Sequence, residues 1–273
     1  MVDILLTVLL IIGIASVLYV LSTVCRRGHA GLSQLKGWAY AHRGLHGQGA
    51  PENSLEAFRR AVDAGYGMEL DVHLLADGGL AVIHDSLLKR TTGREGRIED
   101  LTVGQLRDFT LESTDETIPD FADVLAAVNG QVPLIVELKP AGNNYPLLCQ
   151  KTCELLEHYN GVFCLESFDP RCIYWLRKNR PEMIRGQLTE NYFRSQNSKL
   201  PWILKWILRN QVLNFLTQPD FVAYRYSDRN TFSNTLVRKL WNATMVTWTL
   251  RTPEEYATAV EEGWIPIFEG FNP

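Results

Sequence analysis

Short apolar runs alternate with segments of helical length along most of this chain, and this alternation limits the folds that it can adopt. Nine apolar runs are expected to be strands, at 38–42, 68–74, 80–84, 134–139, 162–167, 184–188, 221–224, 245–250 and 265–268. Helical segments are expected between most of them, at 54–64, 121–128, 145–159, 170–179, 231–241 and 253–262. Strands that alternate with helices favour parallel βα units, and about eight such units predict a closed (β/α)8 barrel.

One connection between two runs is too short for a parallel crossover. Residues 76–79 read Ala-Asp-Gly-Gly, which is a turn sequence, so the second and third runs are expected to form a hairpin. With Leu75 facing Leu80, the register places Asp71 opposite His84, and directly opposite residues share a face of the sheet. The sequence therefore predicts eight strands that can be parallel, and one site that contains both Asp71 and His84.

The size and charge of the chain exclude some classes of protein. With 273 residues, 46% of them hydrophobic, the chain can form one large α/β domain. The formal net charge of −4 is unlike the basic footprint of a nucleic-acid binder, so no nucleic-acid partner is expected. The five cysteines form no C-x-x-C pair, which favours reduced, buried thiols.

The chain begins with an apolar run, residues 4–24, whose length matches a bilayer-spanning helix of about 20 residues. A secretory signal peptide is the alternative, but it needs positive charge before the run, where only Asp3 is charged. Basic residues follow the run instead, at Arg26, Arg27, Lys36 and Arg43. The positive-inside rule therefore predicts a single-pass membrane protein with a cytoplasmic globular part. The expected divisions are an anchor at 1–25, a linker at 26–37 and a barrel at 38–273.

Two segments fit no βα unit. Residues 87–119 are rich in Gly, Thr and charge, and are expected to form a small insertion with a short helix at 101–109. Residues 200–216 are apolar on nearly all sides, with Trp202 and Trp206 one helical turn apart. This second segment is either an interfacial helix near the barrel mouth or an additional packed helix.

Carboxylates lie on two of the expected strands. Glu69 and Asp71 are two residues apart, so they share a face of their strand. Buried acids need a cation, and hard divalent ions take carboxylate oxygens as ligands. Glu137 and Lys139 share a face in the same way, and point toward the same place if these strands belong to one barrel.

Histidines end two of the strands. His42 and His84 form, in outline, a general acid and general base couple. Arg43 follows His42, and its planar guanidinium can hold a phosphate. The ends of barrel strands, where loops begin, are where barrel enzymes carry their chemistry. The other four histidines receive no role, and His73 is expected to face away from the paired carboxylates.

Together these motifs resemble the glycerophosphodiester phosphodiesterase family over residues 38–273. The matching motifs are A-H-R-G at 41–44, P-E-N-S at 51–54, the run from Glu69 to Asp85, T-T-G-R-E-G-R-I-E-D-L-T at 91–102, V-E-L-K at 136–139, E-S-F-D-P at 166–170 and T-W-T at 247–249. The resemblance implies a TIM-like (β/α)8 barrel with a small insertion after the H-D motif. It also implies metal-dependent hydrolysis of glycerophosphodiesters to glycerol 3-phosphate and an alcohol, with the glycerol 2-hydroxyl as internal nucleophile.

The same resemblance implies roles for individual residues. The implied catalytic pair is His42 and His84, the implied ligands of Mg²⁺ or Ca²⁺ are Glu69, Asp71 and Glu137, and the implied phosphate-binding residues are Arg43 and Lys139. Further matched positions are Ser167, Phe168 and Trp248 near the substrate, with Glu52 and Asn53 supporting the site.

The chain departs from the family pattern near its end, so the leaving group stays open. Leu250-Arg251 stands where Val-Asn is common, and residues 269–273 replace the usual T-D-x-P. One alternative function is a lysophospholipase D or sphingomyelinase D-like hydrolase that acts on lysophospholipids at the membrane. Another is a membrane-bound binding protein without catalytic activity.

Overall fold

Nine strands form one sheet that closes on itself in the computed structural model, which describes residues 1–195 and 199–273. The strand order is β1-β9-β8-β7-β6-β5-β4-β2-β3, and β1 also pairs with β2 to close the ring. Every pairing in the ring is parallel, whereas β3 lies antiparallel to β2 on the outside. The predicted (β/α)8 barrel is therefore confirmed.

The elements follow one another in the order that the sequence predicts. The strands are β1 (Tyr40–Ala41), β2 (Gly67–Leu74), β3 (Leu80–Val82), β4 (Leu134–Leu138), β5 (Phe163–Ser167), β6 (Arg185–Thr189), β7 (Phe221–Arg225), β8 (Thr244–Leu250) and β9 (Ile265–Phe268). The helices are α1 (Val2–Ser22), α2 (Leu55–Asp63), α3 (Lys89–Thr92), α4 (Phe121–Val128), α5 (Tyr145–Leu156), α6 (Pro170–Asn179), α7 (Trp202–Arg209), α8 (Asn214–Thr217), α9 (Phe232–Trp241) and α10 (Pro253–Glu261). Short 3₁₀ helices lie at Ala30–Leu35, Ile98–Asp100, Val103–Asp108 and Tyr226–Asp228.

Local signals in the sequence explain where the helices start. The Ser54 hydroxyl accepts a hydrogen bond from the Ala57 amide at 3.1 Å, which caps α2 directly after the P-E-N-S motif. Asp169 caps α6 in the same way, and Pro170 takes the first helical position. Both α4 and α6 have the bounds that the sequence predicts.

The hairpin between β2 and β3 is present, but its predicted register is wrong by one residue. Leu74 pairs with Leu80, so Asp71 aligns with Ile83 and not with His84. His84 lies beyond the end of β3, in the loop that follows it.

The turn of this hairpin explains the difference. The Leu75 amide donates to the Gly79 carbonyl at 2.9 Å, and the Gly78 amide donates to the Leu75 carbonyl at 3.1 Å. The loop therefore has three residues, and its last residue, Gly78, has a φ of 85°. Three-residue hairpin loops require a left-handed residue at this position, and glycine adopts that conformation without strain. The sequence-based register assumed four loop residues.

Apolar side chains pack on both faces of the barrel sheet. The larger cluster fills the space between the barrel and the helices around it. A smaller cluster, which includes Tyr40, Ile135, Cys164, Phe221 and Ile267, packs inside the barrel below the polar residues. Because side chains alternate along a strand, Ile135 and Cys164 lie one step below Glu137 and Glu166 on the same inward face. The barrel interior thus has an apolar floor beneath a layer of carboxylates.

The two additional segments are structured. Residues 87–119 contribute to a third apolar cluster beside β3, and the expected helix at 101–109 is the 3₁₀ helix Val103–Asp108. Residues 200–216 form two short helices, α7 and α8, in place of one long helix, and no residue of α7 is buried. All five cysteines are free and buried, as expected.

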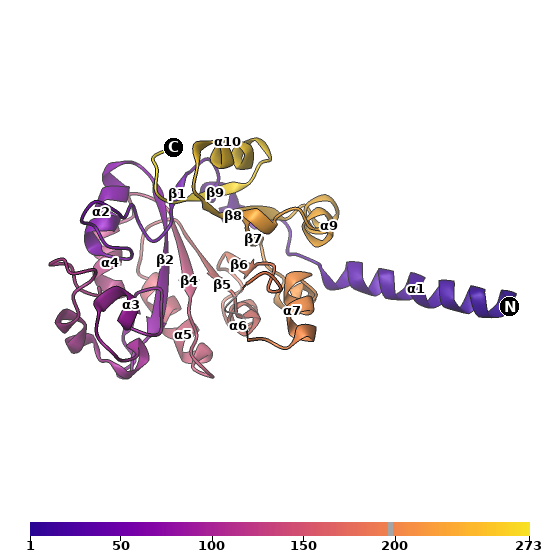
Figure 1. Ribbon diagram of the computed structural model, residues 1–273, viewed down its shortest axis with the longest axis horizontal. Coiled ribbons are helices and arrows are strands. Elements are labelled where there is room, and N and C mark those ends of the chain that lie inside the picture. The colour runs from indigo at the N-terminus through magenta and orange to yellow at the C-terminus, as the bar shows by residue number, and fades with distance from the viewer. Residues whose placement is uncertain (196–198) are drawn as a thin grey trace.

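Helix α1 extends away from the barrel, on the side where α7 and α9 lie (Figure 1). Helix α1 is strongly apolar, and none of its residues is buried. Among the described residues, α1 is the one helix that is long and apolar enough to cross a membrane. Its length and composition fit a membrane span or a signal sequence.

Candidate active site

Three carboxylates meet on the inner face of the barrel. Glu69 and Asp71 lie on β2, and Glu137 lies on β4, where it pairs in register with Asp71. Each of the three offers an oxygen within 4.8 Å of the others, and all three side chains are buried. The structure therefore brings together the three residues that the sequence predicts as metal ligands.

Burial and mutual repulsion strongly affect the protonation of this cluster. Burial, together with the charges of Asp71 and Glu137, raises the pKa of Glu69 well above its ordinary value. Burial also raises the pKa of Glu137. Asp71 behaves differently, because the charges of Lys139, His84 and Arg43 outweigh its burial and lower its pKa. Buried carboxylates that repel one another as anions are stabilised by a bound cation.

The oxygen atoms of the cluster fit a hard divalent cation. Oδ1 of Asp71 is buried and accepts no hydrogen bond, although Lys139 Nζ lies 3.3 Å away. Carboxylate oxygens without other ligand types suit Mg²⁺ or Ca²⁺.

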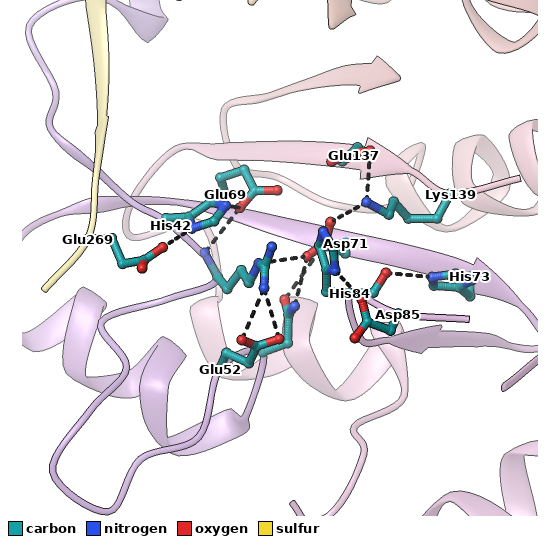
Figure 2. Close-up of polar contacts among 12 residues, drawn as sticks. His42, Glu52, Glu69, Asp71, His73, His84, Asp85, Glu137, Lys139 and Glu269 are labelled. Carbon is teal, nitrogen blue, oxygen red and sulfur yellow. Dashed lines mark hydrogen bonds and ion pairs between the residues drawn. The ribbon is translucent and has the colours of Figure 1, made fainter. Parts of the chain in front are cut away.

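His42 lies beside the cluster and is held by a fourth carboxylate. The His42 amide donates to the Phe268 carbonyl at 2.9 Å, because β1 and β9 are neighbours and Ala41 pairs with Phe268. The next residue pair is therefore His42 and Glu269, and His42 Nδ1 lies 2.5 Å from Glu269 Oε2 (Figure 2). His42 Nε2 points to the carboxylate cluster, 3.8 Å from Glu69 Oε2.

His84 has a similar carboxylate partner. Its Nδ1 donates to Asp85 Oδ1 at 2.6 Å, and Arg90 donates to the other Asp85 oxygen. The hydrogen bond from His84 lowers the pKa of Asp85, with a further contribution from Arg90. Each histidine thus has Nδ1 engaged by a carboxylate, which leaves Nε2 for a substrate.

Two basic side chains flank the cluster. Arg43 Nη1 donates to both oxygens of Glu52 at 3.0 Å, and its Nε lies 3.6 Å from Asp71 Oδ2. Lys139 Nζ lies 3.1 Å from Glu137 and 3.3 Å from Asp71 (Figure 2). The negative charges around Lys139 outweigh its burial and raise its pKa, so it remains a cation.

The P-E-N-S loop organises these groups. Asn53 Nδ2 donates to Asp71 Oδ2 at 2.9 Å, and Glu52 accepts from both Arg43 and Arg90. Neither residue lines the cavity over the cluster, and their supporting role stays a prediction.

A cavity of about 400 Å³ opens over the cluster. Its walls include His42, Arg43, His84, Glu69 and Glu137, and also the predicted substrate residues Phe168 and Trp248. The Phe168 and Trp248 rings meet edge to face with centroids 5.5 Å apart. Ser167 is different, because its hydroxyl donates to the Leu138 carbonyl at 2.7 Å and lies at a second, adjoining pocket.

The model of the glycerophosphoryl diester phosphodiesterase family matches residues 42–269 of the chain. The chain belongs to this family. Enzymes of this family are phosphodiesterases that act on glycerophosphodiesters.

Similar proteins carry the same family name. A glycerophosphodiester phosphodiesterase of Bacillus altitudinis is 40% identical over 129 residues, 44% of this chain and 52% of that protein. The match thus spans about half of that relative's length. A putative glycerophosphodiester phosphodiesterase of Bacillus subtilis is 39% identical over 199 residues, 70% of this chain and 76% of that protein. A phosphodiesterase of Oleispira antarctica, solved with the product sn-glycerol-3-phosphate, has the same fold, with a TM-score of 0.72 and 22% identity over 88% of this chain and 94% of that chain.

Several residues of this site were not predicted from the sequence. Glu269 contacts His42, Asp85 contacts His84, and Arg90 contacts Glu52. Three further residues line the cavity: Glu166, Arg225 and Arg251. Glu269 follows the last apolar run directly, just as His42 follows the first, and that position is a signal for it. Glu166 precedes the S-F-D-P motif and pairs in register with Glu137.

One prediction about β2 is wrong. His73 does not face away from Glu69 and Asp71, since residues two apart on a strand share a face. Its ring lies 3.1 Å from Glu99 and 3.2 Å from the His84 carbonyl, so it supports the loop that carries His84.

Proposed function

We propose that the protein hydrolyses glycerophosphodiesters to glycerol 3-phosphate and an alcohol, with His42 and His84 as the acid and base pair. The observation that supports this proposal is the pairing of each histidine with a carboxylate at Nδ1, on the walls of one cavity. A carboxylate at Nδ1 orients the ring and stabilises the imidazolium, so Nε2 can take a proton and give it back.

The chain's own groups divide the work between them. One histidine takes the proton of the glycerol 2-hydroxyl as it attacks phosphorus, and the other protonates the leaving alcohol. The roles reverse when water opens the cyclic phosphate. Arg43 and Lys139 hold the phosphoryl oxygens and oppose the negative charge that grows on them.

Glu69, Asp71 and Glu137 would hold one divalent cation, Mg²⁺ or Ca²⁺. When bound, the cation supplies positive charge next to the phosphoryl group. Support comes from the mutual approach of the three carboxylates and from the buried Asp71 oxygen that accepts no hydrogen bond.

Exchange of each histidine tests the proposal. His42→Ala and His84→Ala should each lower the rate of glycerol 3-phosphate release from glycerophosphocholine by ~10²–10⁴-fold, the usual contribution of a general acid or base. His158→Ala, which changes an exposed histidine far from the cavity, is the matched control. Circular dichroism should show that all three variants are folded. A wild-type rate in either cavity variant would refute the assignment.

A parallel assay with lysophosphatidylcholine separates the proposal from the lysophospholipase D alternative. The proposed enzyme releases choline faster from glycerophosphocholine than from the lysolipid. The opposite order would favour the alternative, and hydrolysis of neither substrate with Mg²⁺, Ca²⁺ or Mn²⁺ would favour the non-catalytic reading.

We further propose that residues 1–25 are a retained membrane anchor, 26–37 a linker and 38–273 a catalytic barrel in the cytoplasm. Support comes from the unburied apolar helix α1 and from the basic residues that follow it. Intact mass of the membrane-extracted protein tests retention, and a mass without α1 would identify a cleaved signal peptide. Protease digestion of sealed vesicles of known orientation tests the side on which the barrel lies.

A further inference from the structure

The residues directly after α1 fix the direction in which this helix leaves the barrel. Arg26 forms a two-point pair with the buried Asp220, with Nε–Oδ1 and Nη2–Oδ2 distances of 2.5 Å. The Trp241 indole nitrogen donates to the Thr23 hydroxyl at 3.0 Å. Arg27 donates to the Leu240 carbonyl and lies over the Trp241 ring. Because these contacts reach α9 and the residue directly before β7, the barrel cannot turn freely about the end of α1.

A group of exposed apolar side chains surrounds the place where α1 leaves the barrel. We call it the α7–α9 face, and it consists of Trp202, Ile203, Leu204 and Trp206 of α7 and Phe232 of α9. Trp202 is 70% exposed and Phe232 is 68% exposed. The Tyr19 ring of α1 lies 6.3 Å from the rings of both Trp206 and Phe232, so the face continues directly from the apolar helix.

The composition of this face fits the boundary between lipid and water. Tryptophan is enriched at that boundary, where its ring meets both apolar chains and polar headgroups. Lys205 and Arg209 lie on the same helix and can reach anionic headgroups. A contiguous exposed apolar surface next to basic residues is unusual on a soluble monomer and marks an interaction site.

We propose that the α7–α9 face lies in the interface of the same bilayer that α1 enters. This inference rests on the proposed retention of α1 as a membrane span. The pair between Arg26 and Asp220 then keeps the α7–α9 face in contact with the lipid headgroups. The barrel is thus held at the membrane by α1 and by the α7–α9 face. Two residues of the cavity wall, Tyr226 and Ser227, lie a few positions before Phe232 of this face in the sequence.

A fluorescent label on the full chain tests this placement. The native cysteines are all buried, so an introduced exposed cysteine reacts selectively. Ile203→Cys places a bimane label on the α7–α9 face. Leu87→Cys is the matched control, because Leu87 is also an exposed aliphatic residue and precedes α3, on the side of the barrel away from α1 (Figure 1). Both variants are reconstituted with one copy per phosphatidylcholine–phosphatidylserine nanodisc.

The expected result is a blue shift at Ile203→Cys and loss of its fluorescence when lipids carry a quencher at a shallow acyl position, with no change at Leu87→Cys. Equal, water-like emission from both labels would overturn the inference while leaving α1 and the hydrolytic activity intact. A blue shift that appears only with two copies per nanodisc would also overturn it, because the face would then bind a second copy. Failure of the protein to stay in the nanodisc would refute the α1 span itself.

Discussion

The contact between Glu269 and His42 gives the sharpest test of the site. Glu269→Gln keeps the size of the side chain and its ability to accept a hydrogen bond from His42 Nδ1, but removes the negative charge. Burial opposes ionisation of Glu269, yet the hydrogen bond and charge of His42, together with Arg251, lower its pKa to about 2. The negative charge of Glu269 is therefore stabilised mainly by His42, and most strongly when His42 is protonated.

The size of the effect follows from that pKa. A fall from the ordinary 4.5 to about 2 corresponds to about 3.4 kcal/mol of preference for the carboxylate. Because the side chain is partly exposed and Arg251 Nη2 lies 3.0 Å from Oε1, we assign about 2 kcal/mol to His42. Loss of 2 kcal/mol from a transition state that contains the His42 imidazolium lowers kcat by about 30-fold.

The pH dependence adds a second readout. Burial lowers the pKa of His42, and Glu269 opposes this effect. Without that carboxylate the pKa of His42 falls further, so the His42 limb of the kcat/KM profile should move to lower pH. Glu262→Gln is the control, because Glu262 also pairs with an arginine, at 3.1 Å, but lies outside the cavity. An unchanged kcat together with an unmoved profile in Glu269→Gln would refute the role of this carboxylate.

Three further predictions concern stability. Removal of a divalent metal present at 100 times its Kd should lower Tm by about 5–10 °C, since such binding contributes about 2.7 kcal/mol; Glu137→Gln should abolish this difference in calorimetry. Ser54→Ala should lower the free energy of unfolding in urea by about 1 kcal/mol, because the Ala57 amide loses its cap, and an unchanged midpoint would contradict this. Burial raises the pKa of Glu99, but hydrogen bonds from His73 and Ser86 outweigh it and lower the pKa to about 2. The pKa of Glu269 is also lowered to about 2, by His42 and Arg251. Both folded pKa values are below the unfolded ones, so this stability is present at neutral pH and is lost as pH falls from about 4.5 through 2; urea midpoints that do not fall over this range would argue against both contacts.

Much of the site could be predicted because strand ends in a barrel meet at one rim. Period-two alternation placed Glu69 and Asp71 on one face, and parallel pairing brought Glu137 beside them. The same alternation places His73 on that face, contrary to the prediction. Resemblance to the family added Phe168 and Trp248, for which spacing alone gives no role.

Other features could not be predicted from local patterns. The hairpin register depends on the length of the turn, which the hydrogen bond from the Leu75 amide to the Gly79 carbonyl sets at three residues. The partnership of His42 and Glu269 joins residues 227 positions apart, and it exists only because β9 pairs with β1. Arg90 reaches Glu52 from the insertion, whose path across the barrel is set by packing and not by a motif.

The order of the strands around the cavity divides the chain into two parts with different tasks. The segment from β1 to β4 carries both histidines, the three clustered carboxylates, Arg43 and Lys139. The segment from β5 to β8 supplies Phe168, Leu188, Arg225 and Trp248 to the cavity wall. Under the proposed mechanism, substitutions in β5 to β8 can change which alcohol is accommodated without altering proton transfer. Divergence in substrate choice can then accumulate in β5 to β8, while the segment from β1 to β4 and Glu269 after β9 keep the reaction.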